Sequence, residues 1–436
     1  MVSPRQFGWG RWLDLPALEA TSVEHSKNEQ HFFKTEGQGC AFSSCDCDGV
    51  TTFCAVIPPD AADEPNLQEQ ARSAIARLDL LLRRERLEGG TLIQTVFLRR
   101  MEDREVIHRM LLDYYGDHVP AITYVPQRPC DEKLLFIFEV WAMRSAPHRI
   151  RIRRHSPSAV SVDLHNVSYG FFGDILPEAN LTGAYDQSLD ALRRMRSALE
   201  QYGYSVPGLL RTWLYQGSIV RPEGQTQRYK ELNRARTDFF QGVRFLPGLI
   251  PETFTGDVYP ASTGIGADGM SVTVAAAAIS TARGDVRCVP LENPDQTSAF
   301  DYGAVYSPQS PKFSRAMAVV RDNSCVIFVS GTASIVDSET KFIGDAVGQT
   351  EQTLENISRL IDGDNLRRHG IERFGASLDN MAIARVYVKR PEEDYEKIRS
   401  RCGAILTSTP RTFTRADVCR DDLLVEIEGL AFCSRQ

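Results

Sequence analysis

Apolar and polar positions follow a pattern that repeats three times along the chain. Each repeat begins with a segment whose apolar residues recur every three or four positions, at 69–84, 185–203 and 349–361. This spacing is typical of a helix with one buried face. A strand-like run, a second amphipathic segment and a closing apolar strand follow in each repeat. The pattern predicts an α/β (α+β) protein of three similar units.

Aromatic residues mark equivalent positions in the first strand-like run of each repeat. Phe97, Tyr215 and Tyr387 fall at matching places in LIQTVFLRR, LLRTWLYQG and MAIARVYVKR. These runs are rich in β-branched and aromatic residues, which favour strands. The second helices are expected at 105–116, 229–242 and 394–405.

The end of the third repeat differs from the other two. Arg411 is followed fifteen residues later by Glu426, within the apolar run LLVEIEGLAF. Only this repeat carries a charge at both places, which indicates an enzyme with one active site. The residues at the corresponding places are Ile122 and Ile137 in the first repeat and Ser262 and Ala277 in the second.

The bulk properties exclude several classes of protein. A net charge of −7 and a pI near 5.7 argue against a general nucleic-acid binder, which would be basic. No stretch approaches eighteen apolar residues, so no membrane-spanning helix is expected. Ten cysteines in 436 residues indicate reduced thiols. Because the N-terminus also lacks the layout of a secretory signal, we expect a cytoplasmic protein.

The order of elements resembles the reactive-intermediate deaminase family, also called Rid or YjgF, which has a chorismate-mutase-like fold. The resemblance extends to Arg411 beside a proline and to Glu426 in a VEIE strand. Members are usually homotrimers with a site in each cleft between subunits. The resemblance therefore implies a monomeric pseudo-trimer, with Rid-like units at 1–145, 146–296 and 297–436.

Seven words in the second and third units resemble the chorismatases, which convert chorismate to pyruvate and a hydroxylated cyclic carboxylic acid. The first unit resembles only the broader fold and lacks site residues. The resemblance implies no metal or organic cofactor and no partner except the substrate. The words are TWLY (212–215), YKELNRAR (229–236), PASTGIG (260–266), NPDQTSAFDY (293–302), SPKFSRA (310–316), SGTASI (330–335) and DVCRDDLLVEIEG (417–429).

The chemistry of chorismate indicates which residues act. Its two carboxylates require fixed cations, for which planar guanidinium groups are suited, and the resemblance implies Arg236 and Arg411.

Loss of pyruvate requires protonation of the enolpyruvyl methylene carbon by an acid that holds its proton near neutral pH. Glu426 is the candidate, because its apolar neighbours favour the neutral form. Glu428 would share its face, as a partner or exposed to solvent. Tyr215 and Tyr229 are expected to line the same cleft.

Residues at two positions indicate which product the enzyme would release. Chorismatases that release 3-hydroxybenzoate carry a Cys seven residues before the catalytic Glu and a Gly in the PAxTGIG-like loop, here Cys419 and Gly264. The resemblance thus implies 3-hydroxybenzoate, formed through an arene oxide. The alternative product is a dihydroxycyclohexadiene carboxylate. VDSETKFIGD, where a Gly-His pair is expected, and LNRAR, in place of an FCxGR-like string, depart from the family pattern.

Two other functions remain open at this point. In an enamine/imine deaminase, Arg411 would bind the carboxylate and Glu426 would position water. In a non-catalytic binding protein, the same cleft would hold a small molecule without converting it.

Three local motifs are weaker signals. GIGADG (264–269) precedes a strand, whereas a dinucleotide fingerprint opens a helix. Cys40, Cys45, Cys47 and Cys54 lack the spacing of a zinc site. RIRIRR (149–154) alternates Arg with Ile, as in an edge strand with one solvated face.

Overall fold

The computed structural model describes residues 31–37, 39–145, 149–302 and 309–435. Its first sheet has the strand order β1-β2-β3-β6-β4-β5, and only β4 and β5 run parallel. Helices α1 (Leu67–Arg84) and α2 (Arg104–Tyr115) belong to this unit. The strands are β1 (His31–Gly37), β2 (Cys40–Cys47), β3 (Val50–Ile57), β4 (Thr91–Leu98), β5 (Ala121–Val125) and β6 (Phe136–Ser145).

The second sheet repeats this topology. Read as β7-β8-β9-β14-β10-β13, it again has one parallel pair, β10 and β13. Its helices are α3 (Ala184–Gln201) and α4 (Arg228–Phe240), and β11 (Pro222–Glu223) and β12 (Thr226–Gln227) form a small hairpin before α4. The strands are β7 (Ile150–Ser156), β8 (Ala159–Leu164), β9 (Val167–Ile175), β10 (Leu209–Gly217), β13 (Ala261–Ala267) and β14 (Val272–Thr281).

The third sheet has the order β15-β16-β17-β23-β21-β22, with β21 and β22 parallel. Its helices are α5 (Ala346–Ile361), α6 (Gly363–Arg368) and α7 (Pro391–Ile405). The remaining strands are short: β18 (Ile335–Val336), β19 (Glu339–Thr340), β20 (Phe374–Gly375) and β24 (Ser434–Arg435). The sheet strands are β15 (Arg287–Leu291), β16 (Ala316–Arg321), β17 (Ser324–Ala333), β21 (Met381–Val388), β22 (Arg411–Arg415) and β23 (Val425–Phe432).

Three sheets of one topology confirm the predicted α/β fold of three similar units. The helices form near the predicted ranges, because each has an apolar stripe and a suitable first turn. The Asn66 side chain accepts a hydrogen bond from Glu69 N in α1, and the Asp345 side chain caps α5 in the same way. β15 pairs with β16, so the third sheet begins upstream of residue 297. The domain boundaries themselves stay predictions.

The strand register fixes which residues of the three units are equivalent. Phe97 lies opposite Ile137, and Tyr387 lies opposite Glu426, as the repeat predicts. Tyr215, however, lies opposite Thr273. The expected equivalence of Ala277 with Glu426 is therefore wrong, because the connection that leads into β14 is four residues shorter than its counterparts (273 − 262 = 11 against 426 − 411 = 15).

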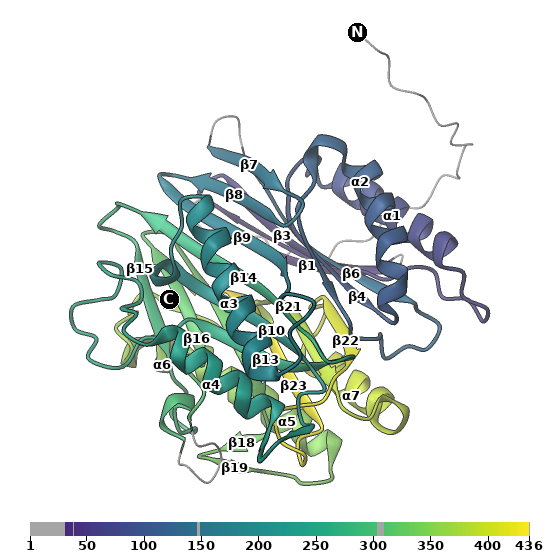
Figure 1. The fold of residues 1–436 in the computed structure, drawn as a ribbon. Coiled ribbons are helices and arrows are strands. Elements are labelled where there is room, and N and C mark those ends of the chain that lie inside the picture. The colour runs from purple at the N-terminus through teal and green to yellow at the C-terminus, as the bar shows by residue number, and fades with distance from the viewer. Residues whose placement is uncertain (1–30, 38, 146–148, 303–308, 436) are drawn as a thin grey trace.

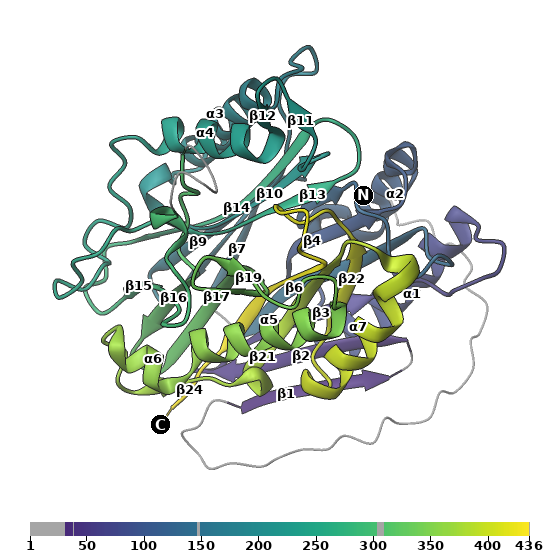
Figure 2. The ribbon, with the colours of Figure 1, turned by 90° about the horizontal axis from the view of Figure 1, so that it is seen from below.

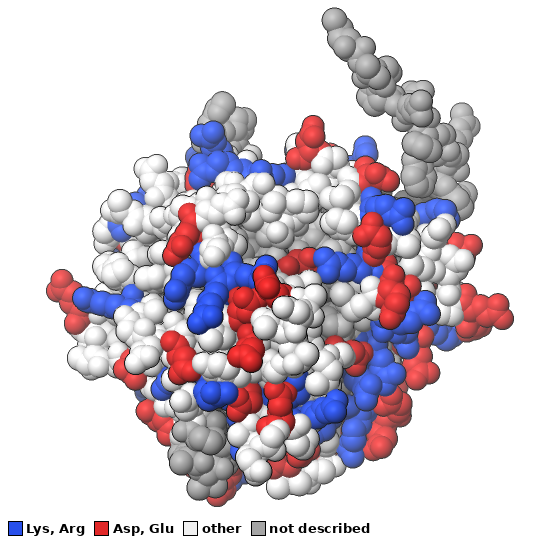
Figure 3. Space-filling model, viewed as in Figure 1, with Lys and Arg blue, Asp and Glu red and all other residues white. Residues whose placement is uncertain are grey.

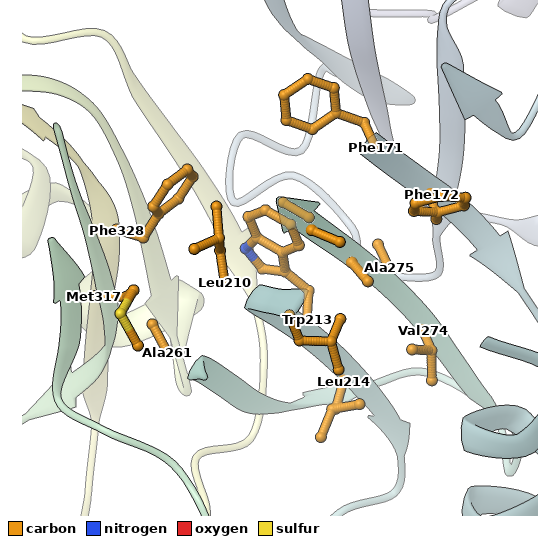
Figure 4. Close-up of a cluster of buried hydrophobic side chains, with 14 of the residues drawn as sticks. Phe171, Phe172, Leu210, Trp213, Leu214, Ala261, Val274, Ala275, Met317 and Phe328 are labelled. Atoms are coloured by element: carbon orange, nitrogen blue, oxygen red, sulfur yellow. The ribbon is translucent and has the colours of Figure 1, made fainter. Parts of the chain in front are cut away.

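The helices lie on the outside of the molecule and the sheets face one another inside (Figures 1 and 2). The largest apolar cluster combines residues of all three sheets, whereas two further clusters pack the first and third sheets against their own helices. Figure 4 shows Trp213 in this central cluster, between Phe171 and Phe172 of β9 and Phe328 of β17. The three units thus share one core, as expected for a pseudo-trimer.

The surface shows no large field of one charge on the face drawn in Figure 3, where positive and negative side chains are interspersed. Within the described ranges, none of the helices is long and apolar enough to cross a membrane.

Candidate active site

A cavity lies between the second and third units, where β13 faces β17. Two hydrogen bonds of 2.9 Å join these strands, from Ser262 N to Ser330 Oγ and from Gly331 N to Thr263 Oγ1. Both strands contain sequence motifs that carry the family resemblance, PASTGIG in β13 and SGTASI in β17. The cavity is lined by Gln227, Tyr229, Ser262, Gly264, Tyr302, Pro311, Phe313, Arg315, Gly331, Ala333, Ile335, Cys419, Arg420 and Glu426.

Glu426 faces this cavity from β23 and is only 5% exposed. Burial raises the pKa of its carboxyl to about 8, and the charge of Glu428 acts in the same direction, against Arg211 and Arg315. Glu426 is thus a neutral acid at pH 7, which agrees with the prediction from its apolar neighbours. A side chain at Gly331 would collide with the Glu426 carboxyl, so the glycine provides the space that this acid occupies.

Glu428 is buried as well, with only 1% of its surface exposed. Burial alone would raise its pKa, but Arg211, Arg385 and hydrogen bonds from Thr263 and Tyr387 outweigh that effect and lower the pKa. The sequence left open whether Glu428 is a partner of Glu426 or is exposed to solvent. Its burial supports the role of a partner. The two glutamates of one strand face therefore differ in protonation, which is the pattern of a tuned acid beside a fixed charge.

Cys419 lies in the loop between β22 and β23 and lines the cavity beside Glu426. Burial raises the pKa of its thiol to about 12, and the nearby Glu426 adds to the effect. The neutral thiol is a poor nucleophile. Cys419 can shape the cavity and offer a weak hydrogen bond there, without covalent attack.

Tyr229 and Gly264 face each other in the wall of the cavity. A Cβ atom added at Gly264 would lie 3.3 Å from Cε2 of the Tyr229 ring, a tight contact. Burial raises the pKa of Tyr229, so its hydroxyl stays protonated. The absence of a side chain at Gly264 therefore lets β13 lie close to the Tyr229 ring of α4 in the cavity wall.

Arg236 lies directly behind this wall and is 1% exposed. Its guanidinium donates to Ser262 Oγ at 3.3 Å and to Asn233 Oδ1 at 2.7 Å, and its centre is 5.5 Å from the Phe313 ring. Among the described residues, its Nε has no hydrogen-bond partner. Arg236 is thus a buried cation next to the lining residues Ser262 and Phe313, and its Nε–H is available to donate a further hydrogen bond.

Arg315 is a cavity residue that the sequence reasoning did not single out, although it lies within the word SPKFSRA. It is 4% exposed, donates to Thr297 O at 3.0 Å and also donates to the Tyr302 hydroxyl. Its Nε lacks a partner in the described part of the chain. Arg420 lines the rim, where it donates to Ser338 O at 2.8 Å.

Arg411 does not share the cavity with Glu426. It begins β22 opposite Ala384, the place that Ser262 holds opposite Thr212 in the second unit. Ser262 faces the third unit, and by the same rotation Arg411 faces the first. Indeed, Thr409 just before β22 accepts a hydrogen bond from Lys34 of β1 at 2.7 Å. The expectation of one cleft carrying both charges is wrong, because the two charges of one unit face different neighbours.

Tyr215 is also separate from the cavity. It is 1% exposed and accepts a 2.7 Å hydrogen bond from Arg385 at the centre of the molecule. It lines a smaller cavity between the first and second units instead. Of the predicted site residues, the structure therefore brings together Glu426, Cys419, Tyr229 and Gly264, with Arg236 one layer behind them.

The fold and the cavity define a class of protein: three α/β units of one topology in one chain, with a protonated carboxylic acid and buried guanidinium groups at one inter-unit cavity. No group of three or more His, Cys, Asp or Glu side chains that could hold a metal ion occurs in the parts of the chain that the structure covers.

Comparison with known proteins names the family. No family model matches the chain. It is 36% identical over 253 residues to a chorismatase from Streptomyces hygroscopicus, covering 57% of this chain and 69% of that protein. It is 35% identical over 273 residues to a 3-hydroxybenzoate synthase from the same organism, covering 61% and 74%. The chain belongs to the chorismatase family. A crystal structure of a chorismatase matches its fold with a TM-score of 0.59 and 23% identity, over 87% of this chain and 98% of the other.

Proposed function

We propose that the protein converts chorismate to pyruvate and 3-hydroxybenzoate. The observation that carries this proposal is Glu426, a buried carboxylic acid that keeps its proton near neutral pH and faces a cavity lined by Arg315. The names of the two relatives, chorismatase and 3-hydroxybenzoate synthase, support the same reaction.

The arginines around the cavity fit a substrate with two carboxylates. Arg315 lines the cavity and Arg236 lies behind Ser262, and each has a buried Nε with no partner among the residues that the structure describes. A buried donor without a partner is unfavourable, so a carboxylate that accepts from it gains more than a simple surface pair would provide. Arg420 at the rim supplies a further cation near the entrance.

The proposed reaction begins with transfer of the Glu426 proton to the terminal methylene carbon of the enolpyruvyl group. The bond between ring C3 and the ether oxygen breaks, and pyruvate leaves with its carbonyl formed. The 4-hydroxyl oxygen attacks C3 and loses its proton, which restores the acid. In the resulting arene oxide the bond from C4 to oxygen opens, the C3 hydrogen leaves as a proton, and the oxygen is protonated to give 3-hydroxybenzoate.

Cys419 and Gly264 are proposed to select this product. Both line the cavity, and both are small. The neutral Cys419 thiol lies beside Glu426, where it can keep the 4-hydroxyl, rather than water, next to C3. With water as the nucleophile, the product would be a dihydroxycyclohexadiene carboxylate.

The deaminase alternative required Arg411 and Glu426 in one cleft, and they face different units. The remaining rival is a non-catalytic binding protein. It predicts thermal stabilisation by chorismate without product.

The test is incubation of the purified protein with chorismate, followed by chromatographic separation with mass detection. We expect equal amounts of pyruvate and 3-hydroxybenzoate. Intact chorismate would refute the proposal, and a dihydroxycyclohexadiene acid would retain the family chemistry but refute the product.

The protein is further proposed to work as a cytoplasmic monomer. Three units already surround one shared core, and all ten cysteines are free thiols, as in a reducing compartment. Size-exclusion chromatography with light scattering tests the monomer.

A further inference from the structure

A buried network of ion pairs joins all three units at the centre of the molecule. Arg385 of β21 donates to both carboxylate oxygens of Glu139 in β6, at 2.8 and 2.6 Å, and to Glu428 at 3.0 Å. Glu428 also accepts from Arg211 of β10 and from Tyr387. Two guanidinium and two carboxylate groups thus balance one another, and none of the four residues is more than 5% exposed.

The three units occupy this region differently although their backbones are equivalent. Thr95 lies opposite Glu139 in the first unit and Arg385 opposite Glu428 in the third. In the second unit the same pair of places holds Trp213 and Ala275. The fold therefore accepts apolar residues here. Because buried ion pairs seldom stabilise more than such packing does, the network calls for a reason other than stability.

The network reaches the acid of the cavity. Thr263 Oγ1 accepts from Gly331 N at 2.9 Å and is hydrogen-bonded to Glu428, while Gly331 lies against the Glu426 carboxyl. Glu426 and Glu428 also share one face of β23. Charges in the network are therefore close enough to influence the protonation of Glu426.

Other ionisable groups face Glu426 from the elements packed around it. Glu428 lies on the same strand, Tyr387 lies opposite on β21, and Arg211 approaches from β10. The remaining groups are Arg315 before β16, Cys419 in the loop before β23, and Tyr229 of α4. Glu139 is not among the residues that line the cavity, and the charged group that it pairs with is Arg385.

We propose that Glu139 of the first unit is a positioning residue for Glu426: by neutralising and orienting Arg385, it keeps the network beside the acid uncharged overall, so that Glu426 holds its proton. This rests on the proposed role of Glu426. It gives the first unit a part in a reaction at the cleft between the other two.

Infrared titration of the Glu426 carboxyl tests this without substrate, using the E426Q spectrum as the difference reference. Glu139→Gln leaves an excess positive charge in the network, so the titration midpoint should fall by about 1 unit. Arg385→Gln leaves an excess negative charge and should raise it. The double variant restores balance, and its midpoint should return towards that of the wild type.

Two controls separate this effect from unfolding and from net charge. Glu105→Gln removes an exposed carboxylate of the same unit, and Phe53→Leu weakens the core of that unit; neither should move the midpoint. Glu139→Asp should keep it near the wild-type value. Unchanged midpoints in folded Glu139→Gln and Arg385→Gln would overturn the proposal. A wild type that leaves chorismate intact would instead refute the proposed function, whatever the infrared result.

Discussion

Two clefts of this molecule have the same backbone and different contents. Between the second and third units, Gly264, Gly331 and Ala333 leave a cavity of about 70 Å³ in front of Glu426. Between the first and second units, a smaller cavity of about 20 Å³ lies beside the rings of Trp141 and Trp213, whose centroids are 6.0 Å apart.

The residue at the place of Glu426 also differs. It is Thr273 in the second unit, which can form a hydrogen bond but cannot deliver a proton near pH 7. From this comparison we propose how one fold yields one active cleft: small residues open the space, and the buried carboxylic acid of Glu426 supplies the chemistry.

Replacement of the acid should have the largest effect. Glu426→Gln keeps the shape of the side chain but removes the transferable proton, so kcat should fall about 10²- to 10⁴-fold. Steady-state release of pyruvate measures this. Thr273→Val at the equivalent place is the matched control and should change kcat less than twofold. An E426Q enzyme with full activity would remove the acid from the mechanism.

Replacement of a guanidinium should mainly affect binding. Arg315→Lys keeps the positive charge but loses the planar fork, and a charged hydrogen bond of about 1.5–3 kcal/mol corresponds to a roughly 10- to 100-fold higher KM. Arg411→Lys is the matched change at the interface of the third and first units and should leave KM unchanged. If instead Arg411→Lys raised KM and Arg315→Lys did not, the assignment of the substrate cleft would be wrong.

Replacement of Cys419 should change the product more than the rate. Cys419→Ala enlarges the cavity beside Glu426 and admits water near the reacting carbon. We expect the dihydroxycyclohexadiene acid to appear next to 3-hydroxybenzoate, while pyruvate release stays within about tenfold of the wild type, because the acid that protonates the substrate is unchanged. Mass detection of both products gives the ratio. Cys402→Ala, a buried thiol on α7, is the control and should give 3-hydroxybenzoate alone.

Much of this architecture could be predicted from the sequence. The apolar periodicities predicted two helices and two of the six sheet strands in each repeat, and the run around Glu426 indicated a buried acid. Local patterns did not reveal which neighbour each unit faces, and so Arg411 was expected beside Glu426. They also did not reveal that a four-residue shorter connection places Thr273, not Ala277, opposite Tyr215.

Two further residues, Arg315 and Glu139, were not predicted from the sequence for a related reason. Arg315 lies just before β16, outside the repeated helix and strand pattern, and only the fold brings it to the cavity. Glu139 looked like an ordinary residue of an apolar strand, since its partner Arg385 is 246 residues away in the chain. Long-range ion pairs of this kind leave no local periodicity.

The last expected effect concerns stability, and its sign follows from the protonation of Glu426. The pKa of this carboxyl is raised from 4.5 to about 8 in the folded protein. An unfolded chain loses this proton near pH 4.5, whereas the folded protein holds it until about pH 8. The contribution of Glu426 to the free energy of unfolding is therefore present in full below pH 4.5 and decreases as the pH rises towards 8.

Glu426→Gln removes this dependence because an amide does not titrate. Thermal melts of the wild type and of E426Q between pH 5 and 8 should therefore show a difference in Tm that moves in favour of the variant as the pH rises. Glu105→Gln, with its exposed carboxylate, should follow the wild type across the same range. Parallel curves for the wild type and E426Q would mean that Glu426 is already ionised at pH 5. The contrast between the two clefts would then be one of shape alone, since an ionised Glu426 could no more protonate the substrate than Thr273 can.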